Sequence, residues 1–176
     1  MKKIIALLLA VILCMTLCAC GGNKQSNDNN TTTSSTENNN EVIEFTDTVI
    51  FEDDNVKLEL VNFFTEEVNL STGKEIEKCF TVKTTNKSNK KISITPNNFY
   101  LNDEKVLISM KNGGMNPDPG KSGKYSFCVS YISTTVHGTA LDSLEELYDL
   151  EGRFELYFVG EGTKYDIDFS VKDVLN

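Results

Sequence analysis

Apolar and polar residues alternate along most of the chain after residue 47. Because successive side chains of a strand point to opposite faces, this alternation predicts antiparallel strands with one buried and one solvated face. The alternating apolar residues are Val56, Leu58, Leu60; Phe80, Val82; Ile92, Ile94; Val106, Ile108; Tyr125, Phe127, Val129, Tyr131; Phe154, Leu156, Phe158; Tyr165, Ile167, Phe169 and Val171.

Turn-forming residues separate these segments at 86–89, 102–103, 112–123 and 160–162. Residues 48–51 add one more expected strand. About eight strands in a region of this length indicate two packed antiparallel sheets. We therefore expect residues 47–176 to form one all-β domain, a β-sandwich.

One segment departs from the alternation. Between residues 141 and 150 the apolar residues are spaced as on one side of a helix, with carboxylates on the other sides. The pattern predicts a short helix of two to three turns near residues 141–150, covering one end of the sandwich. The apolar residues are Leu141, Leu144, Leu147 and Tyr148, and the acidic ones are Asp142, Glu145, Glu146 and Asp149. A solvated face explains these carboxylates better than a metal site.

The N-terminus has the composition of a secretory signal. Lys2 and Lys3 precede an apolar stretch, residues 4–19, which is shorter than the roughly 20 residues that span a bilayer. Leu17-Cys18-Ala19-Cys20 resembles the lipobox of bacterial lipoproteins. The resemblance implies that residues 1–19 are removed as a signal peptide and that Cys20 carries a diacylglyceryl group. The alternative is an ordinary signal peptide with a chance cysteine.

Residues 20–46 are expected to be the lipidated cysteine followed by a disordered tether. The segment after Cys20 is rich in Asn, Ser and Thr, and such a composition cannot offset its own ordering entropy. A flexible linker of this length spans on the order of 25 Å. It would hold the domain away from the membrane, on the extracellular or cell-wall side.

The charge balance excludes two kinds of partner. The chain has 26 acidic and 17 basic residues, a net charge of −9, and Lys2 and Lys3 belong to the expected signal. An acidic surface repels phosphate backbones, so nucleic acid is not an expected partner. Binding of a basic patch to anionic lipid is not expected either, which leaves the N-terminal lipid as the contact with the membrane.

Two segments resemble a known group of proteins. "TNKSNKKISI" (residues 85–94) and "PDPGKSGKYSF" (residues 117–127) are similar to turns of uncharacterised lipoproteins from Gram-positive bacteria. Asn86 and the turn Pro119-Gly120-Lys121 carry this similarity. The resemblance implies an immunoglobulin-like sandwich of the immunoprotective-extracellular type, acting as a binding or accessory module. The helix near residue 145 and two cysteines depart from the pattern, and no catalytic residues transfer.

Cys79 and Cys128 remain outside the signal region. In a chain exposed outside the cell, two such cysteines suggest a disulfide, and closing a 49-residue loop would contribute about 4 kcal/mol. The alternation places both on the polar face. A bridge would then join neighbouring strands of one sheet, or link that face to covering structure. Two separate thiols are the alternative.

The motifs of common enzymes are absent from the sequence. It has one histidine, His137, and no Gly-x-Ser-x-Gly, His-Glu-x-x-His or phosphate-binding glycine loop. We therefore predict no catalytic residues, no metal site and no cofactor. The oxygens of residues 52–55 suit Ca²⁺, but the spacing of an EF-hand is absent.

The loop at residues 111–123 is the expected binding surface, because long loops on a rigid sandwich often carry function. Met115 is expected to be an exposed apolar contact, beside Asn116 and Asp118. A mobile connection between the sheets is the alternative. The expected function is a non-enzymatic, lipid-anchored module that engages an unknown protein or cell-envelope partner. The second hypothesis is a surface lipoprotein that binds a small ligand, a glycan or Ca²⁺.

Overall fold

The computed structural model describes residues 40–71, 73–132, 139–162 and 164–176. These residues form mostly antiparallel sheet, so the expected all-β fold is confirmed. The elements are β1 (Val42–Glu52), β2 (Val56–Leu70), β3 (Gly73–Asn86), β4 (Ile92–Leu101), β5 (Glu104–Met110), β6 (Ser122–Tyr131), β7 (Thr139–Ala140), the 3₁₀-helix η1 (Glu145–Asp149), β8 (Leu150–Phe158), β9 (Lys164–Ser170) and the α-helix α2 (Val171–Leu175).

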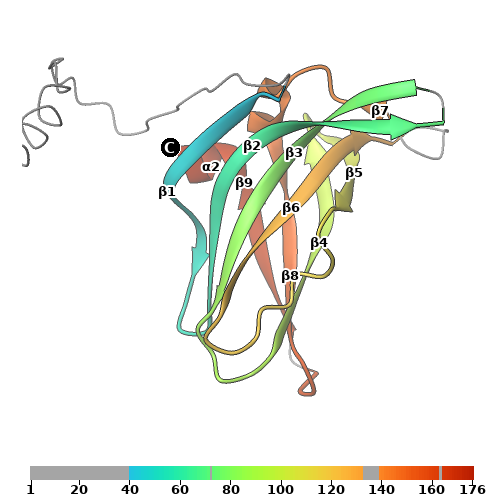
Figure 1. The fold of residues 1–176 in the computed structure, drawn as a ribbon. Helices are drawn as coiled ribbons and strands as arrows, with labels where there is room; N and C mark the ends of the chain where they lie inside the picture. Colours follow the sequence, from blue (N-terminus) through green and yellow to red (C-terminus); the bar gives the residue numbers. More distant parts are fainter. Residues whose placement is uncertain (1–39, 72, 133–138, 163) are drawn as a thin grey trace, which may run out of the picture.

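The strands follow the order β1-β2-β3-β6-β5-β4-β8-β9, and β7 pairs with β6. Only two residue pairs join β5 to β4, Lys105 with Tyr100 and Glu104 with Leu101. The path turns there, so the described residues form a five-strand layer (β1, β2, β3, β6, β5) and a three-strand layer (β4, β8, β9). Figure 1 shows β8 and β9 crossing behind β2, β3 and β6.

Aromatic rings fill the space between the two layers. The ring of Phe80 in the five-strand layer lies 6.2 Å from that of Phe99 and 5.9 Å from that of Phe169, both in the three-strand layer. The ring of Phe127 lies 6.0 Å from that of Phe154. All five side chains are at most 2% exposed. Burial of this much apolar area is the main source of stability in such a fold.

A bulge in β4 brings Phe99 into this core. The pairing of β4 with β8 shifts between Asn97 and Tyr100, and Asn98 takes a φ of 51°. Asparagine tolerates this left-handed conformation better than most residues. On β8, a Cβ atom at Gly152 would lie 2.6 Å from the ring of Phe99. Glycine at this position is therefore required for the ring to pack.

The short helix predicted near residues 141–150 is present as η1, but it is shorter than the expected two to three turns. η1 has only five residues, and β8 begins at Leu150 directly after it. Of the buried leucines at 141, 144, 147 and 150, only Leu147 lies within this 3₁₀-helix, and Leu144 and Leu150 flank it. The α-helix α2 was not predicted. It follows β9, and the Ser170 side chain caps it by accepting a hydrogen bond from Asp173 N.

Two strand boundaries also differ from the prediction. The tether was expected to extend to residue 46, but β1 begins at Val42, and the ring of Phe45 packs 4.9 Å from that of Phe63. The alternation around Phe45 was too short to be recognised. The β2–β3 hairpin is longer than expected, because its far end beyond Thr65 and Lys78 has no buried face that would produce a period of two.

Buried Asn86 connects the two segments that carry the family resemblance. Its Nδ2 donates to Lys90 O (2.8 Å) and to Pro117 O (3.0 Å), and its Oδ1 accepts from the Ser88 hydroxyl at 2.7 Å. Its backbone N–H donates to Lys121 O. One side chain therefore fixes both the turn after β3 and the loop before β6. The two segments on which the resemblance rests, residues 85–94 and 117–127, therefore contain turns that Asn86 holds together.

Cys20, the expected signal peptide and the tether up to residue 39 lie outside the described residues. In the part of the chain that is described, no helix is both long enough and apolar enough to cross a bilayer.

We predict that Asn86→Ala lowers the free energy of unfolding by about 2–3 kcal/mol, because the carbonyls of Lys90 and Pro117 and the hydroxyl of Ser88 lose their partner. Urea unfolding measures this as a lower midpoint at unchanged slope. Ser88→Ala is the matched control, since it leaves the bonds of Asn86 to Lys90 O and Pro117 O in place and should cost about 1 kcal/mol or less. Equal losses for the two variants would contradict this role of Asn86.

Candidate functional site

The outer side of the three-strand layer carries a connected set of side-chain hydrogen bonds and ion pairs. β8 lies between β4 and β9, so its outward side chains stand between theirs. Glu151 is opposite Tyr100 on one side and Ser170 on the other, and Arg153 is opposite Asp168. Side chains from three strands therefore form one continuous surface.

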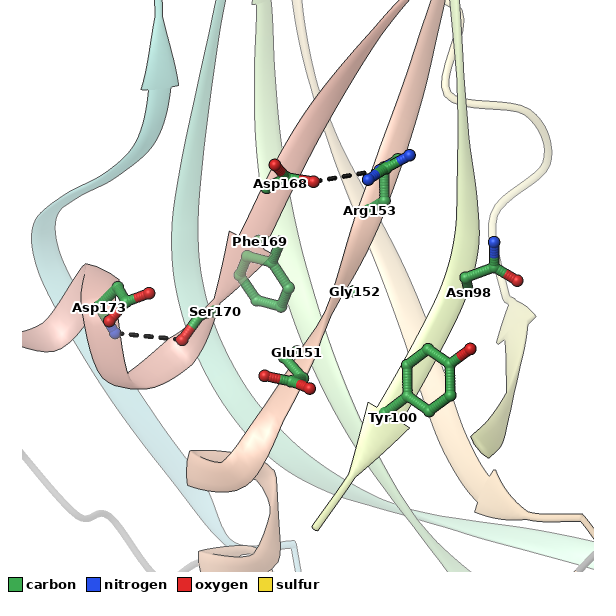
Figure 2. A pocket seen from close by; sticks show the side chains of 9 residues that line it. All are labelled: Asn98, Tyr100, Glu151, Gly152, Arg153, Asp168, Phe169, Ser170 and Asp173. Carbon is green, nitrogen blue, oxygen red and sulfur yellow. Dashed lines mark hydrogen bonds and ion pairs between the residues drawn. The ribbon is translucent and has the colours of Figure 1, made fainter. Parts of the chain in front are cut away.

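A depression of about 510 Å³ lies on this surface, near the start of α2 (Figure 2). The bulge of β4 forms one wall and the β9–α2 junction forms the other. The lining residues are Asn98, Tyr100, Glu151, Gly152, Arg153, Asp168, Phe169, Ser170 and Asp173. Its size lies within the range of small-molecule sites, although it is more open than a cleft.

Arg153, the only arginine of the chain, is held along β9. Its Nε donates to Asp168 Oδ1 at 3.1 Å and its Nη1 to Asp166 Oδ2 at 3.0 Å. The hydrogen bond to Asp168 and the charge of Asp166 raise the pKa of Arg153. The guanidinium is already matched by two carboxylates, so it is a poor receptor for an anion.

The remaining charged groups of the depression are acceptors, whereas the Tyr100 hydroxyl and the Asn98 amide can also donate. Among the described residues, no hydrogen bond or ion pair engages the Tyr100 hydroxyl or the carboxylates of Glu151 and Asp173. Three carboxylates against one guanidinium give the depression a negative charge. It can accept hydrogen bonds from an ammonium group or from hydroxyl groups, with the Tyr100 ring as an apolar wall.

Glu155 organises the neighbouring part of the same surface. It accepts hydrogen bonds from Lys164 Nζ (2.6 Å), the Tyr157 hydroxyl (2.6 Å) and Asn97 Nδ2 (2.7 Å). These three donors, Lys164 first, lower the pKa of Glu155 to about 2. The Tyr157 hydroxyl is therefore engaged by Glu155 and is not free to bind a ligand.

The loop selected from the sequence is anchored rather than free. Met115 is fully buried, so the expected exposed contact is wrong. Its carbonyl accepts from Ile94 N at 3.0 Å, which pairs the loop with β4. Asn116 and Asp118 are exposed, and Asp118 lies 3.9 Å from Lys91 Nζ. The sequence of the loop has no alternation of apolar and polar residues, so nothing in it indicated that the Met115 side chain is part of the core.

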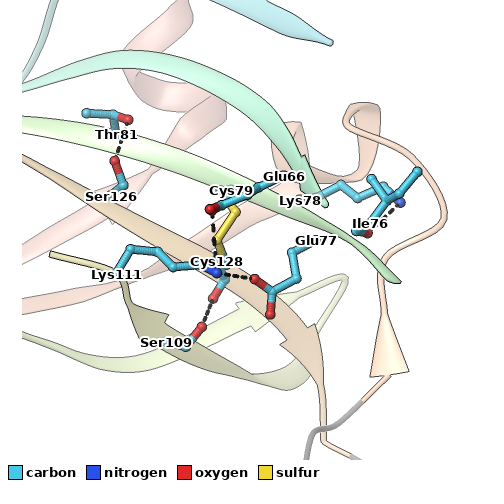
Figure 3. Close-up of a disulfide and its surroundings, with 10 residues drawn as sticks. All are labelled: Glu66, Ile76, Glu77, Lys78, Cys79, Thr81, Ser109, Lys111, Ser126 and Cys128. Atoms are coloured by element: carbon cyan, nitrogen blue, oxygen red, sulfur yellow. Dashed lines mark hydrogen bonds and ion pairs between the residues drawn. A yellow bond between two sulfur atoms is a disulfide. The ribbon is translucent and has the colours of Figure 1, made fainter. Parts of the chain in front are cut away.

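Cys79 and Cys128 form a disulfide that joins the neighbouring strands β3 and β6. The bridge lies on the outer face of the five-strand layer, where the alternation placed both cysteines. On the same face, the hydroxyls of Thr81 and Ser126 lie 3.1 Å apart. Both cysteines are nevertheless buried, at 0% and 2% exposure. The charged residues beside the bridge are shown in Figure 3.

The acidic turn at residues 52–55 is satisfied by the protein itself. Asp53 Oδ1 accepts from the backbone N–H groups of Asn55 and Val56, each at 2.7 Å. Glu52 pairs with Lys87, and the Tyr165 hydroxyl donates to Asp53 Oδ2. This use of the oxygens weakens the case for Ca²⁺ at the turn.

Sequence reasoning selected no residue of the depression. The only signals in the sequence are the single arginine, Arg153, and the alternation of Asp166 and Asp168 with apolar residues, a pattern that any solvated strand face also gives. His137 lies outside the described residues.

We predict that Glu155 titrates at about 2 rather than at the ordinary 4.5. Because its pKa is lower in the folded state, the stability it contributes is complete above pH 4.5 and is lost as the pH falls towards 2. Carbon NMR of the carboxyl group measures the titration directly. Lys164→Met removes the largest cause and should raise the pKa of Glu155. An ordinary titration in the unaltered chain would show that the network does not form.

A comparison with protein-family models gives no match, and a comparison with curated proteins gives no significant one. The similarity to Gram-positive lipoproteins therefore stays an expectation that rests on two turns. The function has to be argued from the geometry of this surface and from the N-terminal sequence.

Proposed function

We propose that this chain is a lipid-anchored, non-enzymatic binding module that faces the extracellular or cell-wall side and engages a protein or cell-envelope partner. The N-terminal sequence supports the anchor, since Leu17-Cys18-Ala19-Cys20 has the lipobox pattern. The polar segment that follows would act as a spacer. Two acyl chains on Cys20 would give stable attachment, which a single chain does not.

The observation that carries the binding function is the acidic depression on the three-strand layer. Its acceptors belong to strands and to the start of a helix, so they are held more rigidly than side chains of a loop. Glu151 and Asp173 favour a partner with positively charged groups, and charge-assisted hydrogen bonds are the stronger kind. Tyr100 adds an aromatic wall that suits an ammonium group.

The second candidate is a binder of a neutral glycan or another small ligand. The volume of about 510 Å³ favours it, because it lies in the range of small-molecule sites. The two candidates differ in what raises the melting temperature. A rise that follows the concentration of a neutral oligosaccharide would favour the second candidate, and a rise with Ca²⁺ alone would favour a cation site.

We predict that amine-bearing peptidoglycan fragments shift the backbone NMR signals around Tyr100 and Glu151. Glu151→Gln or Tyr100→Ala should weaken this binding at least about fivefold, a loss of about 1 kcal/mol. Ser93→Ala, on the same outer face of β4 but outside the depression, is the matched control and should bind as the unaltered chain does. NMR shifts confined to another surface would show that the fragments bind there and not in the depression.

We predict that Cys20→Ala abolishes labelling by radioactive fatty acid and releases the chain from the membrane fraction. Mass spectrometry of the mature N-terminus should show a diacylglyceryl group on Cys20. The membrane-bound chain with an unmodified N-terminus would overturn the anchor. That result would leave the test of the depression unaffected.

A further inference from the structure

Four potential metal ligands gather on the outer face of the five-strand layer. They come from β2, β3 and β6: one carboxylate oxygen each from Glu66 and Glu77, and the sulfurs of Cys79 and Cys128, all within 4.8 Å of one another. Strand register causes this gathering. Glu66 is directly opposite Glu77, and Cys79 is directly opposite Cys128. Glu77 and Cys79 are two residues apart on one strand and so share a face.

The pairing of β3 with β6 keeps Cys79 and Cys128 adjacent independently of the disulfide bond. Lys111 N donates to Ser126 O, so by alternation the backbone of Cys128 also points towards β5. Cys79 and Cys128 are therefore a non-hydrogen-bonded pair, the kind in which facing side chains approach most closely. Their Cα atoms are 3.9 Å apart. Eight residue pairs join β3 to β6, so this ladder would keep the sulfurs adjacent after reduction.

The carboxylates of the cluster already hold a cation. Lys111 Nζ lies 2.6 Å from Glu77 Oε2 and 3.4 Å from Glu66 Oε2 (Figure 3). Glu77 Oε2 is enclosed and forms no aligned hydrogen bond, so this ion pair is its contact. Burial acts to lower the pKa of Lys111, but its close contact with Glu77 and the charges of Glu77 and Glu66 outweigh burial and raise the pKa.

We propose that reduction of the Cys79–Cys128 bridge converts this cluster into a binding site for a thiophilic divalent cation such as Zn²⁺. The two sulfurs and the carboxylates of Glu66 and Glu77 are the ligands, and the Lys111 side chain moves into solvent. The disulfide and the metal use the same sulfurs, so they exclude each other.

The chemistry involves a dithiol reductant and balances in two steps. The reductant supplies two electrons and two protons, the Sγ–Sγ bond breaks, each sulfur becomes a thiol, and the reductant closes its own disulfide. The cation then displaces the two thiol protons, which leave to water, and binds two thiolates. Exchange with a disulfide oxidant takes the two electrons back: the Sγ–Sγ bond re-forms, the oxidant is reduced to a dithiol, and the cation is released.

The ligand set selects the metal. Two thiolates with two carboxylates suit tetrahedral Zn²⁺, whose bonds to sulfur are about 2.3 Å and to carboxylate oxygen about 2.0–2.2 Å. Ca²⁺ and Mg²⁺ prefer oxygen ligands alone, so they are excluded. The four ligands carry four negative charges, which a divalent cation offsets better than the single charge of Lys111.

The test uses Co²⁺ as a spectroscopic substitute for Zn²⁺ on the full chain in which Cys14, Cys18 and Cys20 are replaced by Ser, reduced by a phosphine without oxygen. The expected result is one Co²⁺ per chain, with the visible absorption of tetrahedral cobalt thiolate, and its displacement by Zn²⁺. The oxidised chain should give no such absorption. Glu66→Gln with Glu77→Gln should weaken Co²⁺ binding at least about tenfold.

Matched variants separate the four-ligand site from simple thiol binding. Glu67→Gln is the control for the carboxylates, because Glu67 is on the same strand, points to the other face and pairs with Lys74. It should leave Co²⁺ binding unchanged. Cys79→Ser with Cys128→Ser should abolish it, and Lys111→Gln should strengthen it by removing the competing cation.

Three results would overturn the proposal: no binding to the reduced chain, equal binding after both carboxylates are replaced, or binding only by an unfolded chain. Circular dichroism distinguishes the last case. A reduced chain that loses structure and regains it with Zn²⁺ would support the site. None of these results depends on the anchor or on the acidic depression.

Discussion

The contact between the ring of Phe99 and Gly152 determines how the three-strand layer is built. The ring lies where any larger residue at position 152 would place its Cβ atom. To point there, β4 must add a residue, and Asn98 takes a left-handed conformation that costs free energy for any residue but glycine. Burial of the ring among Phe154, Phe169 and Phe80 offsets that cost. The bulge also places Asn98 and Tyr100 on the outer side, where they form one wall of the depression.

The alternation of apolar and polar residues predicted most of the fold, because a strand with one buried face shows this alternation in its own sequence. The prediction failed where a residue is buried without belonging to a periodic segment. Leu141, Leu144 and Leu147 are buried, yet the helix that the sequence predicted over them is reduced to the five residues of η1, which contain only Leu147. Met115 sits among polar residues and glycines, so no periodicity indicated that it fills the core. Its burial results from a pairing with Ile94 that is distant in sequence.

The candidate sites were less predictable than the fold, because they depend on register. Alternation placed Cys79 and Cys128 on one polar face, but it could not show that they are directly opposite each other. The depression required the pairing of β8 with both β4 and β9. Three strands that are separated by up to about half the domain contribute Tyr100, Glu151 and Asp168. No local pattern in a single sequence indicates that side chains from three such strands lie next to one another.

The cation beside the disulfide follows from the same register. Glu66 and Glu77 lie directly opposite each other, and like charges in that position destabilise a pair of strands. Lys111 lies between them because it follows β5, whose ladder with β6 brings it to the same face. The positive charge of Lys111 therefore offsets a repulsion within the β2–β3 pairing. Any cation that binds both carboxylates can do the same, and the two adjacent sulfurs, once reduced, decide which kinds of cation can compete with a lysine.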